Sequence, residues 1–165
     1  MPEIRQDQAL KPSILDRLID REPDVTRESV RSRSQVIREL KLSVRDDLEH
    51  LLNTRVRCVP WPPALKELKQ SLVNYGIPDL TGASLGSSKE REEFCRVIQG
   101  VISQFDRRLK KLSVRLGDQS ESLDRAIRFT IDAILQAEPT PEPIIFDSTL
   151  QLATGTFEVK GDSNA

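Results

Sequence analysis

The spacing of apolar residues changes at Asp106, and this change limits the fold of the chain more than any other feature. Before Asp106, apolar side chains recur every three or four residues, which places them on one face of a helix. After it, apolar and polar residues alternate, as they do in a strand with one buried face. We therefore expect an α+β fold, with N-terminal helices packed on one face of a three- to four-stranded antiparallel sheet formed by the C-terminal half.

Two long helices are expected. The first starts near Ser34, and its apolar stripe comprises Val36, Ile37, Leu40, Val44, Leu48, Leu51 and Leu52. Asn53 tolerates a left-handed conformation, so we expect it to end this helix and to be followed by an exposed Arg55. The second begins at the capping-box pair Ser87 and Glu90 and continues to Phe105.

Shorter elements are expected before and between these helices. Ser13 and Asp16 mark the start of a short helix that ends near Arg21. Residues 56–63 are rich in proline and predict an extended connector. A helix over residues 63–75 should follow, with Gly76 at its C-terminal end, and residues 77–87 form a loop.

Strands are expected wherever the alternation is regular. The first includes Leu112 to Leu116, and the second, which has the clearest alternation, covers residues 123–136. Prolines 139, 141 and 143 interrupt the pattern before it resumes over residues 144–152. Thr154-Gly155 then turns the chain into a last strand around Phe157 and Val159.

Length and pattern together predict one main domain. A chain of 165 residues can bury a core of its own. We expect residues 1–33 to hold a short helix and a polar linker, residues 34–160 to form a single α+β domain, and residues 161–165 to form a flexible tail.

Composition excludes several classes of function. The 25 basic and 26 acidic residues nearly cancel, which argues against nucleic-acid binding. Only 4% of the residues are aromatic, which disfavours a small-molecule pocket. Cys58 and Cys95 have neither disulfide nor zinc-site spacing. No signal peptide or membrane-spanning run is present, so we expect a cytoplasmic protein without cofactor, metal or membrane insertion.

Charge is distributed unevenly in the C-terminal half. Residues 96–115 contain six basic side chains against Asp106 alone, whereas residues 117–165 contain nine acidic and three basic ones. These charges can pair across neighbouring strands, or they can form an oriented assembly surface. The sequence leaves both interpretations open.

Catalytic motifs are missing from the sequence. It has no phosphate-binding glycine loop, nucleophile elbow or pair of metal-binding histidines. His50 is the only histidine, and a lone histidine beside an apolar stripe is more often packed than catalytic. Carboxylates are plentiful, but no pattern places two of them in a sugar-binding cleft, so we expect no enzymatic activity.

The segment Phe105-Asp106-Arg107-Arg108-Leu109 lies where the last helix gives way to the first strand. An acid beside arginines at such a corner can form an internal ion pair that fixes the turn. Alternatively, a guanidinium can be presented to the carboxylates of a partner. On the residues alone, the internal ion pair is the stronger interpretation.

Several segments, taken in order, resemble one family. They are Leu15-Asp16-Arg17-Leu18, Ser43 to Arg55, Asn74 to Leu80, the corner at residues 105–109, and Ile127 to Ile131. This series is similar to TssE, the baseplate protein of type VI secretion systems that is related to wedge proteins of contractile phage tails. At the corner, the family usually has Glu-Pro-Arg after a Phe, and that motif is implicated in baseplate assembly. Here Asp106 and Arg107 replace the first two residues, and Arg108 is unchanged.

The resemblance implies a structural role. TssE templates the first ring of the contractile sheath, which implies the wedge partners TssF, TssG and TssK, the sheath subunits TssB and TssC, and a location at the inner membrane within the baseplate. The polar residues of the matching segments are then the candidates for partner binding: Asp16, Arg17, Arg45, Asp47, Asn53, Arg55, Asp106, Arg107 and Arg108. A peptidoglycan hydrolase, since some relatives are called lysozyme-like, and a regulatory adaptor on the same fold remain the alternatives.

Overall fold

A computed structural model of the chain describes residues 14, 18, 24, 32–57, 62, 64–79, 87–117, 126–137 and 140–161. Ile14 and Leu18 are helical and exposed. The rest of the short helix expected at 13–21 lies outside the described residues. So do Cys58, most of the proline-rich connector, part of the loop at 77–87, the start of the strand expected at Leu123, and the tail from residue 162 onward.

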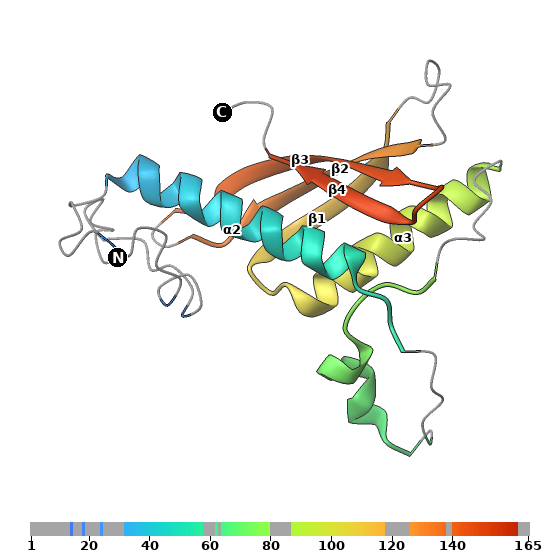
Figure 1. Cartoon of the computed structure of the whole chain (residues 1–165). Helices are drawn as coiled ribbons and strands as arrows, with labels where there is room; N and C mark the ends of the chain where they lie inside the picture. The colour runs from blue at the N-terminus through green and yellow to red at the C-terminus, as the bar shows by residue number, and fades with distance from the viewer. Residues whose placement is uncertain are drawn as a thin grey trace.

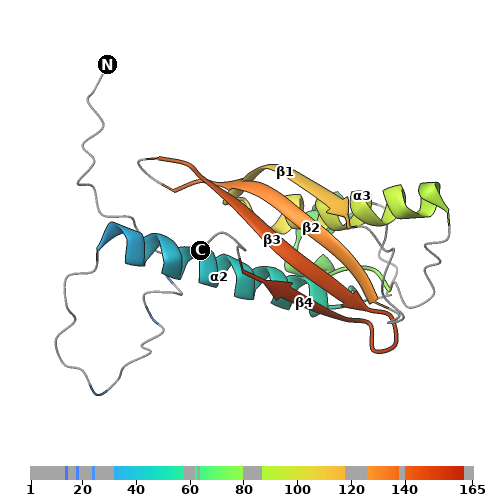
Figure 2. The ribbon, with the colours of Figure 1, turned by 90° about the horizontal axis from the view of Figure 1, so that it is seen from above.

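The described chain forms two helices followed by a four-stranded antiparallel sheet, as the sequence predicted (Figure 1). The helices are α2 (Arg33–Asn53) and α3 (Ser88–Phe105). The strands are β1 (Leu109–Leu116), β2 (Ala126–Leu135), β3 (Glu142–Gln151) and β4 (Thr156–Lys160), and they lie in the order β1-β2-β3-β4. Both helices cover the same face of the sheet, with α3 next to β1 and α2 next to β4 (Figure 2).

Capping boxes start both long helices. The box predicted at Ser87 and Glu90 is confirmed, because each side chain bonds the other residue's backbone N–H. An equivalent box of Ser32 and Gln35 starts α2 two residues before the predicted Ser34. Each box satisfies backbone donors that the first helical turn leaves without partners.

The end of α2 differs from the prediction. Asn53 is the last helical residue, and the chain leaves the helix through Thr54, whose backbone is extended at φ −88° and ψ 133°. Lys111 is the one non-glycine residue of the described chain with positive φ, so the left-handed conformation predicted for Asn53 is wrong. The Asn53 side chain is instead bound to the sheet.

The helix predicted over residues 63–75 is also wrong. The described part contains two 3₁₀ turns, Lys66–Gln70 and Leu72–Asn74, separated by an extended Ser71. Leu72 is 82% exposed, and Leu65 and Val73 are each 50% exposed. Because this apolar stripe buries little surface against the core, a short helix here lacks the packing that normally stabilises one.

The alternation in β2 is confirmed over its full described length, with Ile127, Phe129, Ile131, Ala133 and Leu135 buried. β1 is less regular, because its pairing with β2 shifts between Lys110 and Ser113, and Lys111 has a φ of 49°. Pro143 lies inside β3 instead of ending it. In the part of the chain that the structure describes, β4 pairs only with Asp147 to Gln151. No described strand therefore lies beside β3 at Pro143 on that side, and a missing N–H is tolerated there.

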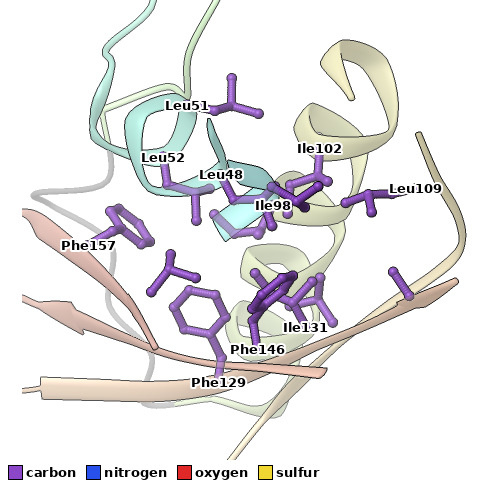
Figure 3. Packing of buried hydrophobic residues seen from close by; sticks show 14 of the residues in the cluster. Leu48, Leu51, Leu52, Ile98, Ile102, Leu109, Phe129, Ile131, Phe146 and Phe157 are labelled. Carbon is purple, nitrogen blue, oxygen red and sulfur yellow. The ribbon is translucent and has the colours of Figure 1, made fainter. Parts of the chain in front are cut away.

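One hydrophobic core joins both helices to the sheet (Figure 3). Leu48 and Leu52 from α2 and Ile98 and Ile102 from α3 lie over aromatic and branched side chains of the strands. Phe129 packs edge-on against both Phe94 and Phe157, with ring centroids 5.7 and 5.9 Å apart. This core fixes the positions of the two places where polar residues gather, namely the α3–β1 corner and the end of α2.

Candidate functional site

The α3–β1 corner is built around a buried carboxylate. Asp106 caps α3, with its backbone N–H 2.8 Å from the Ile102 carbonyl oxygen, and it is only 8% exposed. Arg108 donates to Asp106 Oδ1 from its backbone N–H and its Nε, each at 3.0 Å, and to Oδ2 from Nη2 at 2.7 Å. The two-pronged guanidinium contact fixes the turn between the helix and the strand.

Arg108 also connects this corner to α2. Its Nη2 lies 2.6 Å from Asp47 Oδ2, so one guanidinium joins two carboxylates that are far apart in the sequence. Burial alone would lower the pKa of Arg108, but the hydrogen bonds and charges of Asp106 and Asp47 raise it above its ordinary value. The corner was expected either to form an internal ion pair or to present a guanidinium to a partner. The distances show the internal ion pair for Arg108.

A groove of about 350 Å³ opens beside this ion-pair cluster. Apolar groups from three elements line it, namely Leu48 and Leu51 of α2, Tyr75, and Phe105 of α3, while Asp47, Asp106, Arg107 and Arg108 supply its polar part. Tyr75 packs edge-on against Phe105 at 5.2 Å between ring centroids, and His50 lies 6.2 Å from Tyr75. Burial, followed by the charges of Asp47 and Asp106, raises the pKa of Tyr75.

Arg107 differs from its neighbour in having no internal partner. Its side chain is exposed on the lining of the groove and forms no hydrogen bond or ion pair with any residue that the structure describes. Asp106 and Arg108 are held by one another, whereas Arg107 is available to solvent. Of the three candidate partner-binding residues in this segment, Asp106 and Arg108 are therefore structural, and Arg107 is the one whose charge is accessible.

The end of α2 forms a second polar cluster, in which Asn53 binds β4 as a neighbouring strand would. Asn53 Nδ2 donates to the Phe157 carbonyl at 2.8 Å, and Asn53 Oδ1 accepts from the Phe157 N–H at 2.8 Å. One helical turn earlier, Glu49 Oε2 accepts from the Val159 N–H at 3.3 Å. The two side chains together cover the outer backbone of β4.

Arg55 is half-buried, so the prediction of an exposed side chain is wrong. Its Nη1 donates to the Leu52 carbonyl at 3.1 Å, and its Nη2 donates to the Gly155 carbonyl at 2.5 Å. The guanidinium also lies 5.9 Å from the centroid of the Phe157 ring. Arg55 thus ties the end of α2 to the β3–β4 turn, and the carbonyl acceptors and aromatic face explain its burial.

The remaining candidates lie apart from both clusters. Arg45 pairs with Asp46, the next residue of the same helix, at 2.6 Å. Asp16 and Arg17 lie outside the described residues. The structure therefore brings Asp47, Asp106, Arg107 and Arg108 together at the corner and places Asn53 and Arg55 at the other cluster.

Three residues important to these clusters are missing from the sequence-based candidates. Tyr75 and Phe105 line the groove, and Glu49 accepts a hydrogen bond from the Val159 N–H of β4. Glu49 could have been found from its spacing, because it lies four residues before Asn53 and shares its helix face. For Tyr75, no local signal exists, because its position depends on the path of residues 64–79.

The described ranges also bear on metal binding and on membrane insertion. They contain no group of three or more His, Cys, Asp or Glu side chains arranged to hold a metal ion. Neither α2 nor α3 is long and apolar enough to cross a membrane, and the same is true of every other described helix.

Comparison with known proteins identifies the family. The family model described as baseplate wedge protein gp25 matches residues 38–140, a range that includes most of α2, all of α3, β1 and β2, and ends just before β3. This chain belongs to the baseplate wedge protein gp25 family, which confirms the resemblance to TssE and its phage relatives.

A solved structure, the baseplate complex from the type VI secretion system, contains a similar chain. The two chains are 22% identical, with a TM-score of 0.43, and the alignment covers 69% of this chain and 93% of that one. A search of curated proteins finds no match.

Proposed function

We propose that this chain is a structural subunit of the baseplate wedge in a type VI secretion machine and that it helps to start polymerisation of the contractile sheath. The family match over residues 38–140 supports a baseplate component. The series of segments that resemble TssE, which occur in the same order along the sequence, supports the assignment to this machine. The subunit acts in the cytoplasm, docked at the inner membrane within the baseplate.

The observation that carries this proposal is the groove at the α3–β1 corner. An apolar floor with charged groups around it has the composition of a protein interface, where apolar anchors supply affinity and charges at the rim supply orientation. Arg108 donates to both Asp47 and Asp106, and these ion pairs keep the groove in shape. Arg107 is the group that extends from this surface to a partner.

The partners follow from the same assignment. TssF, TssG and TssK bind the corner, Arg45 on α2, and the surface around Asn53 and Arg55 at the end of that helix. Asp16 and Arg17 of the N-terminal segment belong to the same proposed interface. TssB and TssC bind an edge of the sheet. An exposed edge offers backbone N–H and C=O groups to which a strand of another subunit can add.

The corner has no arrangement suited to glycoside hydrolysis. Asp47 and Asp106 are the carboxylates that line the groove, and both accept hydrogen bonds from Arg108. A hydrolase of the two-carboxylate type needs one of them to donate a proton to the leaving group. Here both carboxylates are held by hydrogen bonds to a common guanidinium, and this arrangement favours a structural role.

The test is the charge reversal Arg107→Glu, compared with Arg38→Glu on the exposed surface of α2. We expect both variants to keep the wild-type melting temperature, because neither arginine is buried. Arg107→Glu should reduce co-purification of the chain with the wedge subunits about tenfold or more, since reversing a rim charge turns attraction into repulsion. Arg38→Glu should co-purify normally.

Normal wedge and sheath assembly by a folded Arg107→Glu protein would overturn the role of the corner. Arg108→Glu is less informative on its own, because it also removes the internal partner of Asp106. Loss of turbidity when the pure protein is added to cell walls, abolished by Asp47→Asn, would revive the hydrolase alternative.

A further inference from the structure

The sheet has an outer face that neither α2 nor α3 covers (Figure 2). Along β2 and β3, the residues that alternate with the buried ones point to this face. Across its middle, polar side chains bind one another: Arg115 pairs with Asp132, and the Thr130 hydroxyl donates to Asp147. The end of the face near the β2–β3 connection has a different composition.

Apolar side chains adjoin one another at that end. Ile134 and Pro143 are opposed across the two strands, and Ile145 follows Pro143 on the same face of β3. Pro143 is exposed, Ile145 is 37% exposed and Ile134 is half-buried. One exposed isoleucine is ordinary, but three adjoining apolar residues form a patch that can serve as the centre of an interface. We call Ile134, Pro143 and Ile145 the outer apolar patch.

A β-bulge in β1 leaves two consecutive lysines exposed beside this patch. Lys110 is opposed to Ile134, and directly after it the pairing of β1 with β2 becomes irregular. Leu109 and Leu112 both pack against the core, although regular alternation over this distance would turn one of them away from it. The extra residue of the bulge keeps both leucines in the core and exposes Lys110 and Lys111 between them.

Lys111 occupies a backbone position that suits glycine. Its φ of 49° lies in the left-handed region, which a residue with a Cβ atom rarely adopts. The Lys111 side chain forms no hydrogen bond or ion pair with any residue that the structure describes, so it does not offset this strain. Backbone strain of this kind is concentrated at functional sites, where the side chain is needed for another purpose.

The outer face can bind a partner only through side chains. The backbone N–H and C=O groups of a sheet lie in its plane and pair with neighbouring strands, so a partner above the face does not reach them. An amphipathic helix meets this condition, as α2 and α3 do on the opposite face. Lys110 has no ion-pair partner in the described chain either, so carboxylates beside the apolar stripe of such a helix would complement both lysines.

A second copy of this chain fits the outer apolar patch poorly. A symmetric contact through the patch would bring Lys110 and Lys111 of the two copies together, and like charges repel. Three apolar residues are also too few to bury the roughly 1,600 Å² of a standard stable interface. The size and charge of the surface therefore favour a single acidic helix over a symmetric dimer.

We propose that the outer apolar patch, together with Lys110 and Lys111, is a docking surface for an amphipathic helix of a partner protein in which Asp or Glu flank an apolar stripe. The stripe lies on the three apolar residues, and the carboxylates pair with the two lysines. The inference goes beyond the proposed function, because none of these five residues lines the groove at the corner.

Isoleucine methyl NMR of the full chain tests the proposal. The probe is an acetylated and amidated peptide of Leu, Ala and Glu with its leucines on one helical face, and the matched probe has Lys in place of each Glu. Ile134 and Ile145 report on the patch, whereas Ile98 is fully buried beneath the opposite face. The Glu peptide should shift the signals of Ile134 and Ile145 and leave that of Ile98 unchanged. The Lys peptide should bind about tenfold more weakly or less.

Lys111→Gly separates binding from folding. Glycine suits the φ of 49°, so this variant should melt at a temperature at least as high as that of the wild-type chain. Loss of the charge should weaken binding of the Glu peptide about threefold or more. Lys66→Gln removes an exposed lysine from another part of the described chain and should bind as the wild type does.

Ile145→Ser removes an apolar contact from the patch. It should weaken binding of the Glu peptide about tenfold, because the peptide then loses part of the apolar surface on which its stripe lies. Absence of shifts at Ile134 and Ile145 with millimolar Glu peptide would overturn the inference, as would equal binding by Lys111→Gly and the wild-type chain. Shifts at these residues that depend on the concentration of the chain alone would place a second copy on the patch and would also overturn it.

Discussion

Arg108 shows how one side chain can fix a corner that the local sequence leaves open. Asp106 is buried, and a buried carboxylate without a partner is strongly destabilising. The guanidinium supplies that partner and also reaches Asp47, so it fixes the position of α2 relative to the start of β1. The Asp106–Arg108 contact could be predicted from the sequence because the two residues are only two positions apart along the chain. The Asp47 contact could not, because it depends on the tertiary packing of α2.

Asn53 and Arg55 show the same limit of sequence reasoning. Their polar character was recognised, but their partners, Phe157 and Gly155, lie about a hundred residues further along the chain. A polar residue at the end of a helix is usually solvated or bound locally, so the sequence favoured exposure. The β3–β4 turn brings the Gly155 carbonyl and the Phe157 ring beside the end of α2, and these long-range contacts bury Arg55.

The ionisation of Tyr75 tests the electrostatics of the groove. Burial and the charges of Asp47 and Asp106 raise its pKa above the ordinary 10.0. The chain has a single tyrosine, so the ultraviolet absorbance of its phenolate reports this residue alone. We expect the midpoint of the titration to lie above 10.0 in the wild-type chain and to fall in Asp47→Asn, because one of the opposing charges is removed.

The control is Asp46→Asn, which removes a charge that does not line the groove and should leave the midpoint unchanged.

The raised pKa of Tyr75 also makes the stability of the chain depend on pH. The folded state favours the neutral phenol, so stability falls as the pH rises from 10.0 toward the higher pKa of the folded chain. A midpoint at or below 10.0 in the native protein would contradict this description of the groove.

At the scale of elements, the quality of the sequence signal depended on packing. The alternation in β2 was predicted closely because the strand is paired with β1 and β3 and one of its faces is covered by the helices. Every second side chain is therefore buried. The segment at residues 63–75 has an equally regular apolar stripe, but that stripe faces solvent. Periodicity indicates which face could be buried, and only the tertiary structure determines whether a surface is there to bury it.

Gly76 joins this segment to the end of α2, and its replacement is predicted to be costly. Its φ is +114°, and a Cβ atom added there would lie 2.4 Å from the Thr54 carbonyl oxygen. That oxygen accepts a hydrogen bond from the Ile77 N–H at 2.9 Å, so it cannot move away without loss. We expect Gly76→Ala to reduce the free energy of unfolding by about 2 to 4 kcal/mol, measured by chemical denaturation.

Gly100→Ala is the matched control for this prediction. Gly100 lies on the exposed side of α3, and a Cβ there meets nothing within 4 Å. The same substitution should therefore stabilise the chain by about 0.5 to 1 kcal/mol, through the higher helix propensity of alanine. Equal stabilities of the two variants would show that Gly76 is not needed for the close approach to Thr54.

At the scale of the whole molecule, the fold and the proposed function use different parts of the same elements. The buried faces of α2 and α3 form the core with the sheet. Their ends and outer faces contribute to the α3–β1 corner, to the side chains that bind the backbone of β4, and to the lining of a groove between α3 and β1. The buried faces were predictable because hydrophobic periodicity reports them directly. The contacts at the corner and at the sheet edges were not predictable, because they depend on which groups from distant parts of the sequence are brought together by tertiary packing.

A single shared core predicts that the helices and the sheet unfold together. Leu48 is fully buried between α2, α3 and the strands (Figure 3). Leu48→Ala should lower the free energy of unfolding by about 2 to 5 kcal/mol. Leu48→Asp should leave the chain unfolded, since a buried unpaired carboxylate removes most of the usual stability of about 5 to 15 kcal/mol. By contrast, Arg45→Glu at a half-exposed position of the same helix should change stability by less than about 0.5 kcal/mol.

Urea unfolding of these variants, followed by circular dichroism and by hydrogen exchange at β2 amides, provides the measurement. In the wild-type chain and in Leu48→Ala, both probes should give the same midpoint, because α2 has no stable packing without the sheet and the sheet has no cover without the helices. If the β2 amides stayed protected at urea concentrations where the helical signal is lost, the sheet would have a core independent of α2. Equal stabilities of Leu48→Asp and Arg45→Glu would contradict the placement of the α2 stripe against the sheet.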